Sequence, residues 1–457
     1  MFIEKLSKCF LKNYKNLSWK SVKIIYNKIM INESDYKKRI IDNKIKEYLE
    51  IVKAILIVGP KWCGKTWTGF YHSNSQVSLM DKNTIEYAKI DPNYILNENY
   101  PQLIDEWQVV PEIRDAVRNK CDSDSVKGKY ILTGSTTVND ENKNVIKHSG
   151  IGRIIPLTMF PLTVFEQQKS TKDISLLDMK NKKVVKKIIK GLSLTDYAEL
   201  IVKGGFPDNV EVPIGKATIL PKKYLESICY EDVIERKKYK KSPSKLKSLL
   251  SSLARNESTV VNNAKIIKDI SEDDSKNGIN NINTLNEYLD YLDSIYVLWY
   301  QKSFSCNYRS KSRIGIKAKR HFVDPSLAAA ALNLTPQKLM DDFNTFGFLF
   351  ESLVERDLKV FMDYYEGELF HFRDNLSGDE VDAICEFSDG TYGAVEIKLS
   401  PYRIEEAKKS LTKFSNNVTK KPVFKCIIVG EYDVIDYDEE NDIYIVPFNA
   451  LGIHEGE

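Results

Sequence analysis

Short apolar runs separated by helical stretches fill the first third of the chain. Residues 54–58 (Ala-Ile-Leu-Ile-Val) are rich in β-branched side chains and precede a Gly-Pro pair, which is typical of a buried parallel strand. Apolar residues at 102–106 and 130–132 predict two further strands. Strands that alternate with helical stretches predict an α/β fold with a doubly wound parallel sheet.

Helical spacing dominates the middle of the chain. Residues 1–50 are rich in lysine and predict two short helices, and the helical pattern returns from 192 to 240 after a polar surface excursion at 170–190. Two short strands are predicted at 297–302 and 320–323. Three helix-like stretches precede them, at 245–256, 263–270 and 284–298. Three helices followed by a two-stranded basic wing is the order of elements in a winged helix.

The last part of the chain predicts a compact mixed α/β domain. Residues 343–362 form a long amphipathic pattern that is typical of a helix, and a second helix is predicted at 404–414. Strand candidates lie at 369–373, 381–387, 392–398, 425–429 and 443–446.

Composition and charge narrow the functional classes. The 457 residues carry a formal net charge of +3, so any nucleic-acid surface must come from local patches. No run of about 18 uncharged apolar residues occurs, and residues 1–20 lack the pattern of a signal peptide. The seven cysteines form no CxxC pair, which is typical of free thiols in a reducing cytosol. We therefore expect a cytoplasmic protein without a membrane span.

A phosphate-binding loop with the Walker A pattern lies at residues 59–66. Its glycines let backbone N–H groups wrap phosphates. We expect Lys65 to reach the β- and γ-phosphates of ATP, and Thr66 to offer its hydroxyl to Mg²⁺. The buried strand before the motif and the helical stretch after it favour a nucleotide site over an incidental glycine turn. The predicted ATP-binding residues are Gly59, Pro60, Lys61, Trp62, Cys63, Gly64, Lys65, Thr66 and Trp67.

Further candidates for the ATP site follow along the chain. Asp105 and Glu106 end an apolar run and fit the Walker B pattern, in which Asp105 holds Mg²⁺ and Glu106 orients or deprotonates the attacking water. Ser135 follows the next strand and is our candidate for sensing the γ-phosphate. Arg153 is a candidate arginine finger or in-cis sensor, and a surface ion pair is the alternative.

These motifs resemble those of the prokaryotic AAA-type ATPases that carry a large C-terminal domain of unknown function. The resemblance covers nearly the whole chain after residue 40. It rests on residues 57–66, 103–108, 132–135, 152–154, 161–166, 204–207, 230–233 and 322–327. Lys61 and Trp67 stand where the family usually has arginine and threonine. The resemblance implies an ATPase core and little about biological role. AAA-type modules often form rings in which an arginine of one subunit completes the site of its neighbour, so the resemblance allows an oligomer and leaves open whether Arg153 acts in cis or in trans.

A second constellation lies near the C-terminus. Asp382 begins one predicted strand, and Glu396 and Lys398 lie two residues apart on the next, so they face the same side of the sheet. Together with Glu351 on the long helix, they resemble the PD-(D/E)-x-K nuclease core. In that chemistry the carboxylates, here Asp382 and Glu396, bind Mg²⁺, and the lysine positions the water. A cross-strand ion pair is one alternative, and an inactive nuclease-like fold that only binds DNA is another.

The elements and motifs divide the chain into five parts. Residues 1–49 form an N-terminal helical extension, 50–168 an AAA-type P-loop ATPase core, and 169–240 a helical lid or linker. Residues 241–335 form a winged-helix-like domain, and 336–457 form a small mixed α/β domain that resembles restriction endonucleases.

Basic clusters favour DNA as the partner of the C-terminal half. Residues 237–241 and 308–320 are rich in Lys and Arg, and the second cluster falls in the predicted wing, where winged helices meet phosphates. We therefore expect Mg²⁺-dependent ATP hydrolysis coupled to a module that binds DNA. One alternative is an ATP-regulated protein-interaction or signalling module with slow turnover. Another is a metal-dependent DNA nuclease regulated by ATP.

Overall fold

The computed structural model describes residues 35–97, 99–136, 152–235, 242–273, 279–307, 317–374 and 378–454. The chain folds into two compact units. The first contains residues 35–57, 65–134 and 152–157 of the described chain. The second contains residues 58–64, 135–136 and the described residues from 158 onward. Within the described ranges, no helix is long and apolar enough to cross a membrane.

A parallel five-stranded sheet forms the centre of the first unit, with the strand order β2-β3-β4-β1-β5. All residues of β1 and β4 are buried, as expected for central parallel strands with helices on both faces. The strands are β1 (Ala54–Val58), β2 (Ser75–Ser78), β3 (Gln102–Asp105), β4 (Tyr130–Gly134) and β5 (Ile154–Thr158). The predicted strands at 54–58, 102–106 and 130–132 are therefore present.

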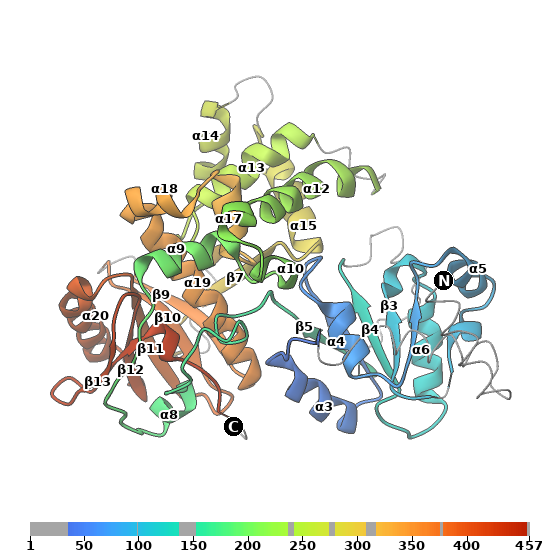
Figure 1. The fold of residues 1–457 in the computed structure, drawn as a ribbon, viewed down its shortest axis with the longest axis horizontal. Coiled ribbons are helices and arrows are strands. Elements are labelled where there is room, and N and C mark those ends of the chain that lie inside the picture. Colours follow the sequence, from blue (N-terminus) through green and yellow to red (C-terminus); the bar gives the residue numbers. More distant parts are fainter. Residues whose placement is uncertain are drawn as a thin grey trace. The chain divides into compact units, whose positions relative to one another are not determined.

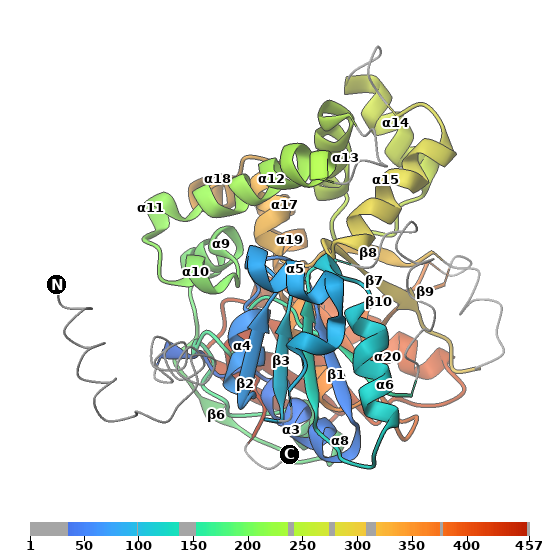
Figure 2. The same ribbon diagram turned by 90° about the vertical axis from the view of Figure 1, so that its right-hand side faces the viewer.

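Helices lie beside this sheet, as Figures 1 and 2 show. They are α3 (Ile41–Ile51), α4 (Lys65–Tyr71), α5 (Lys82–Ile90) and α6 (Ile113–Asp122), with short 3₁₀ turns η2 (Pro92–Ile95) and η3 (Trp107–Val109). The helix α6 buries Ile113, Ala116, Val117 and Cys121, a spacing that places one apolar stripe toward the core. The helix α5 begins at Asp81, whose side chain accepts a hydrogen bond from the backbone of Thr84.

A nine-stranded mixed sheet organises the second unit, with the order β6-β13-β14-β12-β11-β10-β9-β7-β8. Its strands are β6 (Lys187–Ile188), β7 (Leu298–Ser303), β8 (Lys319–Phe322), β9 (Glu368–Arg373), β10 (Glu380–Glu386), β11 (Tyr392–Lys398), β12 (Phe424–Val429), β13 (Val434–Asp438) and β14 (Ile443–Pro447). The strands β9, β10 and β11 are antiparallel neighbours, and β11, β12 and β14 run parallel.

Helices and short turns complete the second unit. They are α8 (Leu176–Lys180), α9 (Leu194–Lys203), α10 (Pro207–Val210), α11 (Ile214–Ala217), α12 (Ile219–Glu235), α13 (Pro243–Arg255), α14 (Asn263–Asp273), α15 (Ile282–Ser294), α17 (Pro325–Ala331), α18 (Pro336–Asp341), α19 (Phe343–Tyr364), η4 (Pro401–Arg403), α20 (Ile404–Asn417) and η5 (Phe448–Ala450).

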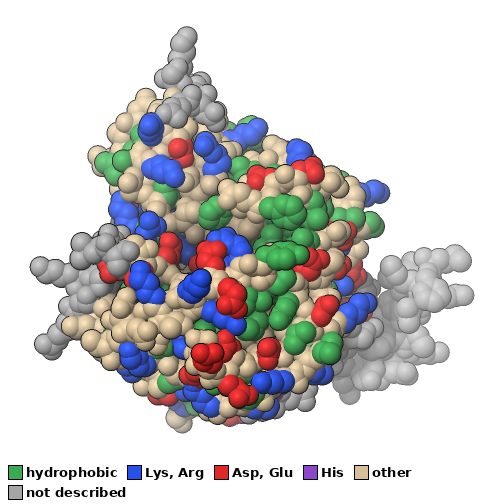
Figure 3. Space-filling view, turned by 90° about the vertical axis from the view of Figure 1, so that its left-hand side faces the viewer, with side chains coloured by type: hydrophobic (Ala, Val, Ile, Leu, Met, Phe, Trp, Pro, Cys, Tyr) green, Lys and Arg blue, Asp and Glu red, His purple; other side chains and the backbone are tan. Residues whose placement is uncertain are grey.

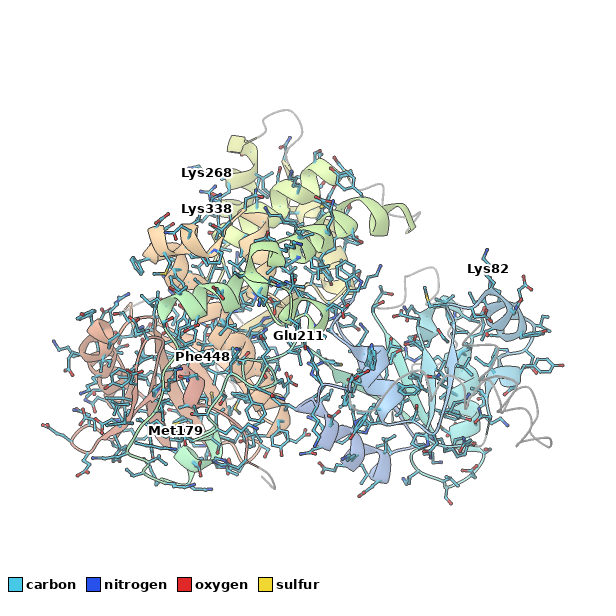
Figure 4. All side chains as sticks on the ribbon, viewed as in Figure 1. Lys82, Met179, Glu211, Lys268, Lys338 and Phe448 are labelled. Atoms are coloured by element: carbon cyan, nitrogen blue, oxygen red, sulfur yellow. The ribbon has the colours of Figure 1, made fainter. Side chains whose placement is uncertain are left out.

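Two helices position the polar residues of the C-terminal sheet. The helix α20 packs Ala407, Leu411 and Phe414 onto a buried apolar cluster of β9–β12 and β14. The helix α19 contacts β9, β10 and β11. Next to α19, Phe448 packs against the rings of Tyr197 and Phe350 in the interior of the unit (Figure 4).

The two predicted wing strands are present as β7 and β8, and they pair antiparallel. They do not form a separate hairpin, because β7 also pairs in parallel with β9. The sheet of the predicted nuclease-like domain therefore continues into the predicted winged-helix domain, and a boundary between residues 335 and 336 divides one sheet. Most of the basic loop, 308–316, lies outside the described residues, as do 236–241 of the other basic cluster and 1–34 of the N-terminal extension.

Candidate functional site

Two residues of the Walker A loop, Gly59 and Gly64, have backbone conformations that favour glycine. Gly59 has φ 152° and Gly64 has φ 100°, and L side chains rarely adopt such values. A Cβ at Gly59 would lie 2.2 Å from the carbonyl oxygen of Met159. The N–H of Met159 donates to the carbonyl oxygen of Val58 at 2.7 Å. These contacts fix the point at which the loop leaves β1.

Asp105, at the end of β3, receives two hydroxyl hydrogen bonds on one oxygen. Thr66 Oγ1 donates to Asp105 Oδ1 at 2.8 Å, and Thr133 Oγ1 donates to the same atom at 2.7 Å. Lys65 precedes Thr66 and is almost fully buried. Hydroxyl and carboxylate oxygens are ligands that Mg²⁺ prefers, so Thr66 and Asp105 fit the ion that accompanies ATP.

Glu106 is held in a left-handed backbone conformation, with φ 56°. Its backbone N–H donates to Thr133 Oγ1 at 3.2 Å, and its carboxylate accepts a hydrogen bond from the side-chain amide of Gln108. Strained backbone in a non-glycine residue is often found at functional sites. Gln108 was not among the predicted site residues, although it lies in the motif at 103–108.

The two remaining ATP-site candidates differ in their surroundings. Ser135 follows β4 and is 4% exposed. The side chain of Arg153 is 47% exposed, and its Nε donates to Asp122 Oδ1 at 2.8 Å. The surface ion pair that was the alternative for Arg153 is thus the arrangement in the structure.

An aromatic contact joins the Walker A loop to α12. Trp62 adopts φ 64° and meets the ring of Tyr224 edge-on, with the ring centroids 5.2 Å apart. Tyr224 also contacts Phe206, with the ring centroids 5.1 Å apart. Tyr224 and Phe206 both lie in the segment 169–240, which was predicted as a helical lid or linker.

The predicted C-terminal constellation comes together as an ion-paired group. Lys398 Nζ lies 2.6 Å from Glu396 Oε2 and 3.2 Å from Asp382 Oδ2. The backbone N–H of Ile397 also donates to Asp382 Oδ2 at 2.7 Å, and Ser410 on α20 donates to Glu396 Oε1 at 2.7 Å. The cross-strand ion pair expected as an alternative is therefore present.

Glu351 joins the same group through a lysine that sequence reasoning missed. Lys319, on β8, lies 2.7 Å from Glu351 Oε1 and 3.1 Å from Glu355 Oε1. Its side chain is 1% exposed. We call Lys319, Glu351, Glu355, Asp382, Glu396 and Lys398 the carboxylate cluster. Glu355 lies one turn after Glu351, and this i, i+4 spacing was the signal that could have identified it.

Two opposing effects act on the pKa values of the acidic side chains in the carboxylate cluster. Burial raises them, and the positive charges of Lys319 and Lys398 lower them. Burial raises the pKa of Glu351 to about 7 and that of Glu396 to about 8. Burial also acts on Asp382, but the charges of Lys398 and Lys319 hold its pKa below the ordinary value. The pKa of Lys319 is raised by Glu351 and Glu355 despite burial. The raised pKa values of Lys319 and Lys398 keep both lysines protonated near neutral pH, whereas the pKa values of Glu351 and Glu396 lie close to neutral pH.

A layer of buried polar residues adjoins the cluster. Ser258 donates to Glu355 Oε2 at 3.0 Å, and His321 Nδ1 lies 3.6 Å from the same oxygen. Glu257 accepts hydrogen bonds from Ser352 at 2.8 Å and from the backbone of Phe322 at 3.2 Å. Burial raises the pKa of Glu257 to about 8.

The carboxylate cluster does not fit a metal ion as the predicted nuclease core would. Within the described ranges, no group of three or more His, Cys, Asp or Glu side chains is arranged to hold one. The reason is visible in the contacts, since the ammonium groups of Lys319 and Lys398 lie between the carboxylates.

A buried arginine links three segments of the second unit. Arg356, which is fully buried, lies 2.7 Å from Asp324 and 2.7 Å from Asp357. Asp324 accepts a hydrogen bond from the N–H of Gly205, and Asp357 accepts one from the N–H of Val164. These contacts bring together the motifs at 161–166, 204–207 and 322–327.

The sequence pattern of the AAA domain matches residues 52–167. This span contains the Walker A loop and the Asp105–Glu106 pair described above. The predicted AAA-type P-loop ATPase domain is therefore present at residues 52–167. Two domains of unknown function match later parts of the chain, DUF8612 at residues 194–338 and DUF4143 at residues 346–451. No curated protein matches the chain.

Three solved structures are similar to parts of this chain. The Walker-type ATPase of Pyrococcus abyssi is 14% identical, with 66% of this chain and 97% of that chain covered and a TM-score of 0.40. The ORC2 protein of Aeropyrum pernix is 12% identical, with 67% and 96% covered and a TM-score of 0.32. The RuvB Holliday junction branch migration motor of Thermotoga maritima is 17% identical, with 59% and 90% covered and a TM-score of 0.24.

The predicted family is therefore confirmed, as an AAA-type P-loop ATPase with C-terminal domains of unknown function. The parallel sheet of the ATPase core is confirmed as well. The winged-helix-like and nuclease-like interpretations stay predictions. The same holds for the roles given to Lys65, Glu106, Ser135 and Arg153.

Proposed function

We propose that this AAA-type ATPase binds Mg²⁺-ATP at the Walker A loop and hydrolyses it. The observation that supports this most directly is the 2.8 Å contact between the hydroxyl of Thr66 and the carboxylate of Asp105. These two groups belong to different motifs, 39 residues apart, and each is a suitable ligand for the same ion.

Each motif then has a task in phosphoryl transfer. The loop N–H groups and Lys65 would bind the phosphates, and Thr66 and Asp105 would hold the Mg²⁺ ion, which would supply positive charge next to them. Glu106 accepts a hydrogen bond from the attacking water and takes its proton, while Gln108 positions the Glu106 carboxylate. Ser135 donates to the γ-phosphate. Arg153 can act as a sensor only after it leaves its ion pair with Asp122.

Steady-state phosphate release tests this assignment. We expect Lys65→Ala and Glu106→Gln each to lower turnover by about 100- to 1,000-fold, because each removes a group that acts on the transition state. Lys82→Ala is a matched control, since Lys82 is exposed on α5 (Figure 4). Wild-type rates in both site variants would disprove the assignment.

We further propose that the C-terminal half couples turnover to DNA. The support comes from the basic residues at 237–241 and 308–317, most of which lie outside the described ranges. Lys319, which follows the second cluster, is buried and paired with Glu351 and Glu355, so it does not contribute to this support. The face of the molecule in Figure 3 has Lys and Arg side chains intermixed with Asp and Glu around a band of hydrophobic side chains. The described side chains on that face form no uniformly basic surface, so the proposed DNA contact rests on the two basic clusters of the sequence.

Phosphate release with and without double-stranded DNA separates the hypotheses for the partner. A rise in turnover with DNA, lost as salt increases, supports DNA coupling, because phosphate contacts release counterions. Slow turnover that DNA does not change supports the ATP-regulated protein-interaction or signalling module instead. Replacing the four lysines at positions 237, 238, 240 and 241 with glutamine should reduce the DNA response without changing the basal rate.

A further inference from the structure

The carboxylate cluster gathers four acidic side chains from three elements of the C-terminal sheet and its helix. Glu351 and Glu355 come from α19, Asp382 from β10 and Glu396 from β11. Glu355 is fully buried, and Glu396 is 4% exposed. Carboxylates this close and this buried repel one another, so the fold must bring cations or protons to them.

Lys319 supplies a cation from an element outside the predicted nuclease core. It is the first residue of β8, at the edge of the sheet next to β7. Its ammonium contacts both glutamates of α19, at 2.7 Å and 3.1 Å, and its charge also acts on Asp382. A single buried nitrogen therefore compensates carboxylates from two elements.

Most of the carboxylate oxygens in the cluster already accept hydrogen bonds from the protein. Both oxygens of Glu396 have donors, Ser410 and Lys398. Both oxygens of Glu355 have donors as well, Ser258 and Lys319. A divalent ion requires several such oxygens at about 2.0–2.6 Å, and it would have to displace these donors.

We propose that Lys319 takes the place of a divalent cation in the carboxylate cluster. The C-terminal domain then keeps a nuclease-like arrangement of acidic side chains, but the cluster binds no metal ion and cleaves no DNA. This inference concerns a site separate from the ATP site, and it stands whether or not the proposed ATP hydrolysis is correct.

The position of Lys319 also predicts what its removal would do. The oxygens of Glu351 and Glu355 converge on the ammonium within 3.1 Å. Shifts of less than about 1 Å would bring them to the distances of a Mg²⁺ or Mn²⁺ ion. Lys319→Ala leaves both the space and the ligands, whereas Lys319→Met fills the space with an apolar chain of similar length.

Mn²⁺ binding, followed by electron paramagnetic resonance on the full chain without nucleotide, tests the proposal. Wild type and Asp382→Asn are expected to bind the same number of ions, because the ATP site is common to both. Lys319→Ala is expected to bind one more ion than wild type, and Lys319→Met none more. Adding Glu355→Gln to Lys319→Ala should remove the extra ion.

Several results would overturn the proposal. One is the loss of an ion on going from wild type to Asp382→Asn, which would mean that the wild-type cluster binds metal. Another is a well-folded Lys319→Ala protein that binds no additional ion, and a third is an extra ion in Lys319→Met. Plasmid nicking by wild type that Asp382→Asn abolishes would contradict it as well. If neither Lys319 variant folds, the comparison of wild type with Asp382→Asn decides alone.

Discussion

Asp105, which is buried, and Asp382, which is partly buried, are strand carboxylates in the two units, and they are held by different kinds of donor. Asp105 accepts its hydrogen bonds from the hydroxyls of Thr66 and Thr133. Asp382 accepts from the backbone of Ile397 and from the ammonium of Lys398. Hydroxyl donors fix a carboxylate without neutralising it, whereas an ammonium cancels its charge.

The difference bears on what each site can bind. A carboxylate oriented by hydroxyls keeps its attraction for a cation, and one of those hydroxyls, Thr66, can become a ligand itself. In the carboxylate cluster, the ammonium groups of Lys319 and Lys398 already pair with the carboxylates where a cation would bind. Acidic residues at the right spacing are therefore insufficient to identify a metal site, because the neighbouring donors determine whether the charge is available.

The largest expected effect comes from removing Arg356, the cation that pairs with two buried carboxylates. Arg356→Met leaves Asp324 and Asp357 buried without their shared partner. We expect a loss of about 3–5 kcal/mol in the free energy of unfolding, measured by urea denaturation. The matched control is Arg403→Met, because Arg403 pairs with Glu406 on the surface, and we expect it to cost at most about 1 kcal/mol. Equal effects of the two variants would contradict the importance assigned to burial.

Asp105→Asn examines the hydroxyl-held carboxylate directly. The amide keeps the size of the side chain but removes the charge that attracts Mg²⁺, so we expect ATP turnover to fall by about 100- to 1,000-fold. Stability should change little, because Thr66 and Thr133 can still donate to the amide oxygen. Asp91→Asn is the control, because Asp91 caps η2 and an asparagine can still accept the hydrogen bond from the backbone of Asn93. An ATP turnover rate in Asp105→Asn equal to that of wild type at physiological Mg²⁺ would show that Asp105 is not a ligand.

The sequence was sufficient for features that depend on local pattern and insufficient for those that depend on distant contacts. Apolar runs predicted β1, β3 and β4, and the spacing of Glu396 and Lys398 correctly placed both on one strand. The role of Lys319 could not be predicted in this way. It was assigned to a basic wing, and its partners become evident only when β7 joins β9 and brings β8 near α19.

Glu257 provides a pH-dependent test within the buried layer. Burial raises its pKa from 4.5 to about 8 in the folded protein, so the folded state binds this proton more tightly than the unfolded chain. Below pH 4.5 the Glu257 carboxyl is protonated in both the folded and the unfolded chain, so it does not lower the free energy of unfolding. As the pH rises from 4.5 toward about 8, the unfolded chain loses this proton first, and the free energy of unfolding falls. We expect Glu257→Gln to flatten this fall in urea unfolding measured across the same range. Glu431→Gln, at an exposed position, should leave the slope unchanged, and an unchanged slope in Glu257→Gln would place the proton on another carboxylate.

Trp62 should give the smallest effect, because it contributes one exposed ring contact and one strained backbone conformation. The edge contact with Tyr224 is expected to contribute about 0.5–1.5 kcal/mol to stability. The left-handed φ of 64° at Trp62 opposes it by about 1–2 kcal/mol for any residue that has a Cβ.

Two substitutions separate these contributions. Trp62→Ala loses the ring and keeps the strain, whereas Trp62→Gly loses the ring and relieves the strain, so we expect the glycine variant to unfold at higher urea concentration than the alanine variant. Tyr224→Ala should lower the free energy of unfolding in every background, because its contact with Phe206 is lost in each. In a double-mutant cycle its loss should be smaller in either Trp62 variant than in wild type by the energy of the ring contact, about 0.5–1.5 kcal/mol. Additive losses from Trp62→Ala and Tyr224→Ala would mean that the contact contributes nothing. In that case other contacts of the loop, such as the one between the Cys63 thiol and the carbonyl oxygen of Met159, would stabilise its conformation.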